Sequence, residues 1–399
     1  MQSAVPFLPY GRQSIDEADI AAVCDVLRGD MLTTGPAVEA FEADFAKAVG
    51  AAHAVSCSNG TAALHLAMLA LGLGPGNSVV VPSVTFLATA NAARFTGAEV
   101  VFADVDPDTG LLTPATLEDA LERAGSDVRA VLPVHMAGQV ADIDGLNGVA
   151  RKAGALLVED ACHALGSLDA SGRPVGGCAV SEMATFSLHP VKTIAAGEGG
   201  IVTTSDRQRA EAMKRSRNHG MSKVDFRIPA QAFATDGSAN PWYYEMDEPG
   251  FNYRLSDIHA ALARSQLSRL GQFVHRRSEL VERYDELLAP LAPLVRPAGR
   301  VAGRPGWHLY VVLIDFGQAG LERATLMERL RSEGIGTQVH YLPVHRQPYY
   351  RDRYGELDLP GADSWYQRAL SLPLFPAMSD SDVDRVVSAL QDALGLDAG

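Results

Sequence analysis

The chain has 399 residues, which is enough for two unequal domains, and its 47% hydrophobic and 21% charged residues are typical of a globular protein. A formal net charge of −14 disfavours nucleic acid and anionic membranes as partners, because both are bound through clustered positive charge. No apolar run approaches the length of a membrane span, and the N-terminus does not have the pattern of a secretory signal. We therefore expect a cytoplasmic protein.

The cysteines show no CxxC pairing and no histidine pattern of the kind that binds zinc. This favours a reduced protein without a metal site. The cysteines are Cys24, Cys57, Cys162 and Cys178.

Short β-rich runs alternate with helix-patterned runs between about residues 50 and 205. This alternation predicts a largely parallel sheet with helices on both faces, and in such sheets ligands lie beyond the carboxyl ends of the strands. The predicted strands are 52–57, 78–83, 98–105, 129–135, 155–160, 183–189 and 199–205, and the first four are followed by the predicted helices 61–72, 85–97, 113–125 and 145–154.

The rest of the chain divides at a group of prolines. After a predicted helix at 206–217, the irregular segment 221–250 indicates a long functional loop or a hairpin. A long helix is predicted from 256 to 289, where prolines end it. The runs 308–315, 323–334, 335–341, 369–376 and 381–395 indicate a second α/β unit. We predict domains at 1–289 and 290–399, which the long helix could bridge.

The stretch SNGTAALHL, from Ser58 to Leu66, follows a predicted strand and opens a helix. A helix start presents free N–H groups to an anion, and Gly60 would let a ligand approach the backbone closely. The hydroxyl of Thr61 could add a contact. An ordinary N-cap without a ligand explains the stretch equally well.

An apolar strand runs directly into Glu159 and Asp160 in the stretch ALLVEDACHALGS. A carboxylate among buried residues is costly unless a cation accompanies it. On this segment alone, a helix N-cap is the simpler interpretation of Asp160.

Only one of the five lysines follows a predicted strand and precedes a glycine-rich turn. That residue is Lys192, in the stretch FSLHPVKTIAAGEGG. Lys47, Lys152 and Lys214 fit polar helix surfaces, and Lys223 falls in the long loop. An apolar site lowers the pKa of a lysine and makes the neutral, nucleophilic amine accessible, which is what Schiff-base chemistry needs.

Together these three features suit pyridoxal 5'-phosphate (PLP). This cofactor needs a phosphate cradle, an acid that pairs with its pyridinium nitrogen, and a lysine that forms a Schiff base with its aldehyde. The combination is more specific than any one feature, and PLP is the predicted cofactor.

The ordered motifs resemble those of the DegT/StrS-type nucleotide-sugar aminotransferases, which belong to the fold-type-I (aspartate aminotransferase-like) PLP enzymes. The similarity runs from PYGRQSI to ALSLPLFP and includes LTTGPAVEAFE, SNGTAALHL, VEDACHALGS, FSLHPVKTIAAGEGG, GFNYRLSDIHAAL and VHYLPVH. It implies an α/β fold with a large PLP-binding domain and a smaller C-terminal domain.

The resemblance also implies roles for individual residues. Lys192 would form the Schiff base and shuttle the proton, and Asp160 would pair with the pyridine nitrogen. The other cofactor contacts would be Gly60, Thr61 and Ser187 at the phosphate, Phe86 on the ring face, His163 near the ring hydroxyl, and Asn252 from the neighbouring subunit of a homodimer. Thr34, His340 and Tyr341 would lie toward the sugar nucleotide. Without the family pattern, Phe86, Ser187, His163 and Asn252 all have ordinary structural interpretations.

Within the family, PYGRQSI, HPVKTI, PVHMAGQ and GFNYR are most similar to enzymes of pseudaminic acid biosynthesis. Those enzymes aminate C4 of UDP-2-acetamido-2,6-dideoxy-β-L-arabino-hex-4-ulose, with L-glutamate as amino donor. Departures at Cys162, Leu188 and Ala195-Ala196 leave open a transaminase for another UDP- or dTDP-linked keto sugar. A sugar C3-dehydratase would carry histidine in place of Lys192. A non-catalytic PLP-binding regulator is disfavoured by the intact lysine, aspartate and phosphate cradle.

Overall fold

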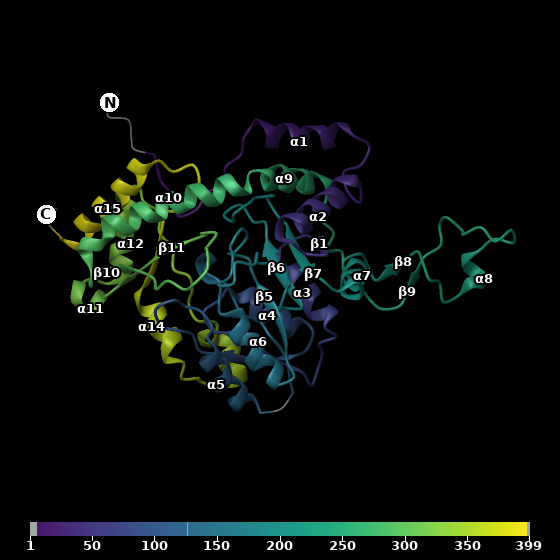
Figure 1. Ribbon diagram of the computed structural model, residues 1–399, viewed down its shortest axis with the longest axis horizontal. Coiled ribbons are helices and arrows are strands. Elements are labelled where there is room, and N and C mark those ends of the chain that lie inside the picture. The colour runs from purple at the N-terminus through teal and green to yellow at the C-terminus, as the bar shows by residue number, and fades with distance from the viewer. Residues whose placement is uncertain (1–5, 126, 397–399) are drawn as a thin grey trace.

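The computed structural model describes residues 6–125 and 127–396, and its centre is a seven-stranded sheet (Figure 1). The strand order is β1-β7-β6-β5-β4-β2-β3, and β7 is antiparallel to both of its neighbours while the other pairs are parallel. The largely parallel sheet predicted from the sequence is therefore confirmed. The strands are β1 (His53–Cys57), β2 (Ser78–Pro82), β3 (Glu99–Ala103), β4 (Val128–Val131), β5 (Leu156–Asp160), β6 (Met183–Ser187) and β7 (Gly200–Thr204).

Helices cover both faces of this sheet. Crossovers between parallel strands are right-handed, so helices that connect strands in opposite directions along the sheet lie on opposite faces. On one face lie α3 (Gly60–Ala70), α4 (Leu87–Phe95) and α7 (Arg207–Ser216), which packs against α3. On the other face lie α5 (Pro114–Ala124) and α6 (Ile143–Lys152), which pack against each other.

The predicted helix 256–289 is divided in two. Arg269, with φ −103° and ψ 7°, separates α9 (Asp257–Ser268) from α10 (Leu270–Leu288). The N-terminal helices α1 (Glu17–Arg28) and α2 (Pro36–Val49) pack against α9. A buried ion pair between Arg269 and Asp19 of α1 lies at the break, so α1 is tied to the point where the two helices meet.

The C-terminal region is built on a second, three-stranded antiparallel sheet in the order β10-β11-β12. Its elements are β10 (Val295–Pro297), β11 (Tyr310–Ile314), α11 (Phe316–Ala319), α12 (Arg323–Ser332), α13 (Pro348–Tyr354), α14 (Pro360–Arg368), β12 (Ala369–Leu372) and α15 (Asp380–Leu394). Three short 3-10 helices lie at Met136–Gly138, Ala289–Leu291 and Val344–Arg346. The run 335–341, expected as part of this unit, forms only isolated bridges, from Ile335 to Leu8 and from Gln338 to Ser371.

Two hydrophobic cores meet at β11. Val311 and Leu313 belong to the core of the large sheet, whereas Val312 and Ile314 belong to the second core, because successive side chains of a strand point to opposite faces. Helix α10 also spans both cores, with Phe273 in the first and Leu280 in the second. The helix therefore bridges the two units, and a domain boundary near Pro290 stays a prediction.

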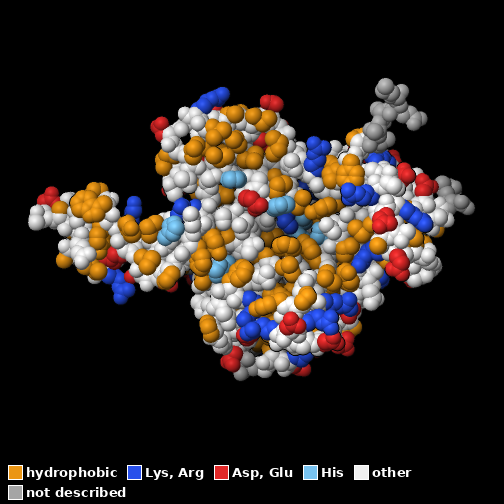
Figure 2. Space-filling model, turned by 180° about the vertical axis from the view of Figure 1, so that it is seen from behind, with side chains coloured by type: hydrophobic (Ala, Val, Ile, Leu, Met, Phe, Trp, Pro, Cys, Tyr) orange, Lys and Arg blue, Asp and Glu red, His pale blue; other side chains and the backbone are white. Residues whose placement is uncertain are grey.

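The segment after α7 forms an arm that projects from the body of the protein (Figure 1). It is a hairpin of β8 (Met221–Ser222) and β9 (Glu245–Met246) with the short helix α8 (Pro229–Ala232) between them. Several large apolar side chains of the arm face solvent (Figure 2): Val224, Ile228, Phe233, Trp242, Tyr244 and Met246. Across the described residues, none of the helices has the length and apolar character needed to cross a membrane.

Candidate active site

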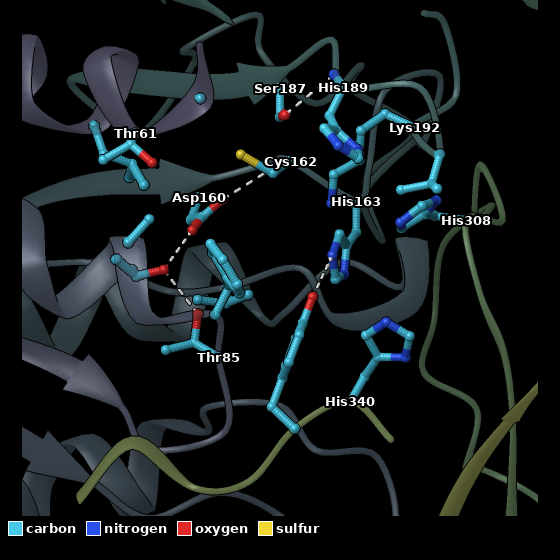
Figure 3. Close-up of a pocket in the computed structure, with 18 of the residues that line it drawn as sticks. Thr61, Thr85, Asp160, Cys162, His163, Ser187, His189, Lys192, His308 and His340 are labelled. Carbon is cyan, nitrogen blue, oxygen red and sulfur yellow. Dashed lines mark hydrogen bonds between the residues drawn. The ribbon is translucent and has the colours of Figure 1, made fainter. Parts of the chain in front are cut away.

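A cavity of about 450 Å³ lies at the carboxyl edge of the large sheet (Figure 3). Asp160 ends β5 and Ser187 ends β6, while Gly60 opens α3 just after β1 and Phe86 is the N-cap of α4 just after β2. The cavity brings together nine of the residues predicted from the sequence: Gly60, Thr61, Phe86, Asp160, His163, Ser187, Lys192, His340 and Tyr341.

Lys192 lies in the loop between β6 and β7, where its N–H donates to the carbonyl oxygen of His189 at 2.8 Å. Burial lowers the pKa of Lys192, because the charged form loses solvation, and the nearby Cys162 and Asp160 only partly offset this effect. The neutral amine is therefore more accessible than at a solvent-exposed lysine.

Asp160 is buried, and its two carboxylate oxygens have different donors. Oδ2 accepts a hydrogen bond from Oγ1 of Thr89 at 2.7 Å, and Oδ1 accepts one from the N–H of Cys162 at 3.2 Å. Oγ1 of Thr85 lies 2.7 Å from Oγ1 of Thr89, so a second hydroxyl supports the first. Each oxygen of the carboxylate therefore has a donor that fixes its orientation. Neither threonine was predicted as a site residue, although both fall in the predicted helix 85–97 with i,i+4 spacing.

The start of α3 and the end of β6 approach each other closely. A Cβ atom on Gly60 would lie 2.8 Å from Cβ of Ser187, so only glycine fits there. The side chain of Asn59 caps the helix by accepting from the N–H of Ala62 at 2.8 Å. The first N–H groups of a helix have no intrahelical partner, and together with the hydroxyls of Thr61 and Ser187 they form a cradle suited to a phosphate.

Four aromatic side chains, those of Phe86, His163, His340 and Tyr341, line the other side of the cavity. The hydroxyl of Tyr341 lies 3.1 Å from Nε2 of His163, and the rings of Tyr341 and Phe86 have centroids 6.0 Å apart. Nδ1 of His340 lies 2.8 Å from Oγ of Ser371. Burial, with a smaller effect of the charge on Lys192, lowers the pKa of His340 to about 3, so this ring is neutral at pH 7.

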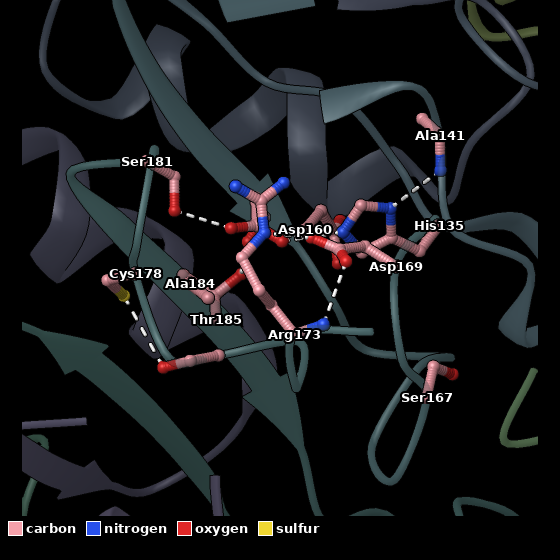
Figure 4. Close-up of polar contacts among 12 residues, drawn as sticks. His135, Ala141, Asp160, Ser167, Asp169, Arg173, Cys178, Ser181, Ala184 and Thr185 are labelled. Atoms are coloured by element: carbon pink, nitrogen blue, oxygen red, sulfur yellow. Dashed lines mark hydrogen bonds and ion pairs between the residues drawn. The ribbon is translucent and has the colours of Figure 1, made fainter. Parts of the chain in front are cut away.

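Glu159 precedes Asp160 on β5, so its side chain points to the other face of the sheet. A second polar group, which includes His135 and Ser181, surrounds it there (Figure 4). Oε2 of Glu159 lies 2.8 Å from Nε2 of His135, and Oε1 accepts from the hydroxyl of Ser181. Nδ1 of His135 accepts from the N–H of Ala141 at 3.3 Å, so the proton of a neutral ring is on Nε2 and points at Glu159. The backbone N–H of His135 donates to the carbonyl oxygen of Asp160, which links this group to the cavity.

Two predicted residues lie outside this cavity in the single chain. Thr34 lines a separate hollow with Arg217, Asn218 and Arg254, and Asn218 forms a bridge with Asn252. Thr34 and Asn252 are thus near one another but are not brought to Lys192. Other residues of the main cavity were not predicted, among them Tyr10, Glu198 and His308. Within the described ranges, no cluster of three or more potential ligands could hold a metal ion.

The fold and the cavity define a PLP-dependent aminotransferase. A half-buried lysine, a hydrogen-bonded carboxylate and a helix start that can hold a phosphate converge there, and the cavity volume suits a cofactor with a substrate beside it. The DegT/DnrJ/EryC1/StrS aminotransferase family matches residues 13–391, and the chain belongs to this family.

Known relatives agree over almost the whole chain. The spore coat polysaccharide biosynthesis protein SpsC of Bacillus subtilis (strain 168) is 40% identical over 389 residues, which are 97% of each chain. PseC of Helicobacter pylori, an aminotransferase involved in the biosynthesis of pseudoaminic acid, has a TM-score of 0.87 at 26% identity, covering 98% of this chain and 99% of its own. The PLP-form of the sugar aminotransferase Spr1654 of Streptococcus pneumoniae has a TM-score of 0.85 at 27% identity, with 98% and 99% covered. The chain is therefore a fold-type-I sugar aminotransferase that uses PLP.

Proposed function

We propose that the protein transfers the amino group of L-glutamate to the C4 keto group of a UDP-linked 4-keto-6-deoxy-N-acetylhexosamine. The proposed sugar is UDP-2-acetamido-2,6-dideoxy-β-L-arabino-hex-4-ulose, and the product belongs to pseudaminic acid biosynthesis. The observation that carries the reaction is the convergence of Lys192, Asp160 and the start of α3 on one cavity. The choice of sugar is supported by the likeness to PseC over 98% of the chain.

In this proposal the cavity residues hold the cofactor and move the proton. Lys192 carries PLP, Asp160 holds the pyridine nitrogen, and the remaining contacts come from Gly60, Thr61, Ser187, Phe86 and His163. When bound, PLP supplies an electron sink that makes the proton on the reacting carbon removable. Once the amine of glutamate has taken its place, Nζ of Lys192 would take the proton from Cα; water would then release 2-oxoglutarate, and the amino nitrogen would stay behind at the site. In the second half-reaction this nitrogen would pass to C4 of the sugar, whose keto oxygen leaves as water, and Nζ of Lys192 would give the proton to C4.

The proposed active unit is a homodimer in which each subunit completes the other's site. Thr34 and Asn252 lie away from Lys192 of their own chain, at the base of an arm whose Trp242 is 73% exposed and whose Met246 is 59% exposed. Large apolar side chains that face solvent on a projecting arm are typical of a surface that a partner covers. We assign the partner subunit's Asn252 to the phosphate, and Thr34, His340 and Tyr341 to the sugar nucleotide. The acidic chain with its four free cysteines suits the cytoplasm.

A second candidate function is the amination of another UDP- or dTDP-linked keto sugar. The 40% identity to SpsC, a protein of spore coat polysaccharide biosynthesis, favours this alternative. The reaction and the residues that perform it are the same in both cases, and only the sugar and its destination differ.

The deciding experiment incubates the PLP-loaded protein with glutamate and a panel of UDP- and dTDP-linked 4-keto sugars, and identifies aminated products by mass spectrometry and NMR. Amination of the UDP-linked L-arabino-4-ulose in preference to the others supports the first proposal, and preference for another sugar supports the second. If the cofactor is bound and no keto sugar is aminated, both are overturned. Lys192→Ala is the control, and it should lose both turnover and the visible absorbance of lysine-bound PLP.

The shared site is tested by complementation in trans. Lys192→Ala and Asn252→Ala are each expected to be inactive as homodimers. After subunit exchange, a mixed dimer holds one site with both substitutions and one site with neither. About half of all dimers are mixed and half of their sites are intact, so roughly a quarter of wild-type activity should return. No recovery in mixtures that contain mixed dimers would show that Asn252 acts within its own chain.

A further inference from the structure

Buried nitrogen atoms without hydrogen-bond partners gather beside the cavity. They are Nδ1 of His163, Nδ1 of His308, and both Nε and Nη1 of Arg277. Four of the seven buried side-chain atoms that lack a partner in the described chain belong to these three residues. The rings of His163 and His308 have centroids 4.5 Å apart, and His308 lines the cavity near Lys192 (Figure 3).

Close packing brings three separate segments to this point. Helix α10 contributes Val274, whose Cγ2 would lie 2.7 Å from a Cβ on Gly166, and Arg277 follows Val274 by one helical turn. Gly166 follows His163 by three residues. The backbone of Gly306, two residues before His308, packs against the backbone from Leu165 to Ser167. Arg277, His163 and His308 therefore surround one location behind the cavity wall.

The guanidinium of Arg277 has no counterion in the described residues. It is only 1% exposed, and no carboxylate of residues 6–125 or 127–396 forms an ion pair with it. Burial lowers the pKa of Arg277 to about 10, so the side chain is still charged at pH 7. A buried, unpaired charge costs several kcal/mol, so this arrangement calls for an anion that the chain itself does not supply.

The surroundings suit an anion that enters through the cavity. Burial, together with the charges of Lys192 and Arg277, lowers the pKa of His308 well below its usual range. The ring is therefore neutral, and it offers one N–H as a donor beside a net positive charge. Among the described residues that line the cavity there is no arginine, whereas the charge of Arg277, behind the wall, acts on His308.

We propose that His308 and Arg277 form the binding site for a carboxylate of the amino donor, with His308 in contact with the carboxylate and Arg277 supplying positive charge from behind it. This rests on the proposed function, in which the donor is the dicarboxylate glutamate and the product is 2-oxoglutarate. A compact planar carboxylate fits a location enclosed by packed backbone, whereas the diphosphate of a nucleotide sugar needs a longer and more open groove. Arg277 helps to position the carboxylate through its charge, without contact. His308 contacts the carboxylate of the amino donor directly.

The test measures binding of glutarate, a dicarboxylate with neither an amino nor a keto group, to the PLP-loaded protein by calorimetry in chloride-free buffer. His308→Asn and Arg277→Gln should each weaken glutarate binding by about 10-fold or more, since hydrogen bonds to charged groups have this strength. Arg277→Lys keeps the charge and should restore part of the affinity. Arg276→Gln, on the neighbouring position of α10 and paired at the surface with Glu279 and Asp380, should bind glutarate as the wild type does.

Kinetics separate this role from a structural one. In the variants, KM for glutamate should rise about as much as the dissociation constant of glutarate, while the affinity for UDP is unchanged. Unchanged glutarate binding in His308→Asn, loaded with PLP, would overturn the site even if Arg277→Gln does not fold. If the wild type transfers an amino group from glutamate and the variants still bind glutarate normally, the carboxylate site is wrong and the proposed function stands. If the wild type neither uses glutamate nor binds glutarate, both proposals are wrong.

Discussion

Oγ1 of Thr89 donates a hydrogen bond of 2.7 Å to Oδ2 of Asp160, across 71 positions of sequence. Thr89 lies on α4, and Asp160 ends β5. Helix α4 thus aligns the carboxylate that we propose holds the pyridine nitrogen, through the hydroxyl of Thr89. Thr85 stands one step further from the carboxylate, because its hydroxyl lies 2.7 Å from the hydroxyl of Thr89.

We predict that Thr89→Val weakens PLP binding and slows turnover by about 10- to 100-fold, the range expected for a hydrogen bond to a charged group. Thr85→Val should have a smaller effect, since it leaves the bond to Asp160 in place. Cofactor affinity from absorbance titration and kcat at saturating PLP are the measurements. Equal effects of the two substitutions would contradict a direct role of Thr89.

Much of the site could be predicted because it follows the ends of strands. Asp160 is the last residue of β5, as the apolar run 155–160 predicted. The predicted strand 183–189 runs two residues past Ser187, the last residue of β6, and the role of Ser187 came from the family resemblance. The pairing of Thr89 with Asp160 could not be predicted, because it depends on how distant segments pack. The same holds for Arg277, whose place on an amphipathic helix gives no sign that its charge acts on His308.

Parts of the fold were missed for similar reasons. The helical pattern continues through Arg269, and the break there depends on packing around the ion pair with Asp19 of α1. The apolar run of β11 is typical of a strand buried in one core, but its two faces pack into two different cores. Periodicity reports which face of an element is apolar, and it does not report what lies against that face.

A second prediction concerns the close approach of Gly60 to β6. In Gly60→Ala the new Cβ would lie 2.8 Å from Cβ of Ser187, so α3 or β6 must shift at the proposed phosphate cradle. We expect a loss of about 1–3 kcal/mol in stability and a weaker affinity for PLP, as for overpacked sites. Thermal unfolding and PLP titration measure these effects. Gly148→Ala is the matched control, because its helical position has open space around it and alanine there should stabilise α6 slightly.

A third prediction concerns the buried pair of His135 and Glu159. His135→Ala leaves the carboxylate of Glu159 buried with Ser181 as its remaining side-chain donor, and we expect it to destabilise the protein by about 3–5 kcal/mol. Arg264→Ala removes an ion pair with Asp44 in which both side chains are about half exposed, and it should cost less than about 1 kcal/mol. Urea unfolding of the two variants makes the comparison. Similar losses in both would show that Glu159 finds another partner or becomes protonated.

The last prediction concerns acid stability and His340. Its pKa is about 3 in the folded protein because the ring is buried, whereas a histidine in the unfolded chain has a pKa of about 6.5. Between these values the unfolded chain binds a proton that the folded chain does not bind. The free energy of unfolding therefore falls as the pH is lowered through this window, by up to about 1.4 kcal/mol per pH unit for this one group.

His340→Asn removes this proton uptake, and the free energy of unfolding should then depend less steeply on pH between about pH 4.5 and 6.5. His275→Asn is the control, because the side chain of His275 is 78% exposed and its substitution should leave the slope as in the wild type. Urea unfolding at several pH values, with PLP in constant excess, measures the slopes. The buried His163 and His308 have lowered pKa values as well, so the slope of His340→Asn should remain above zero. A slope unchanged by His340→Asn would mean that this ring is protonated equally in the folded and unfolded chains.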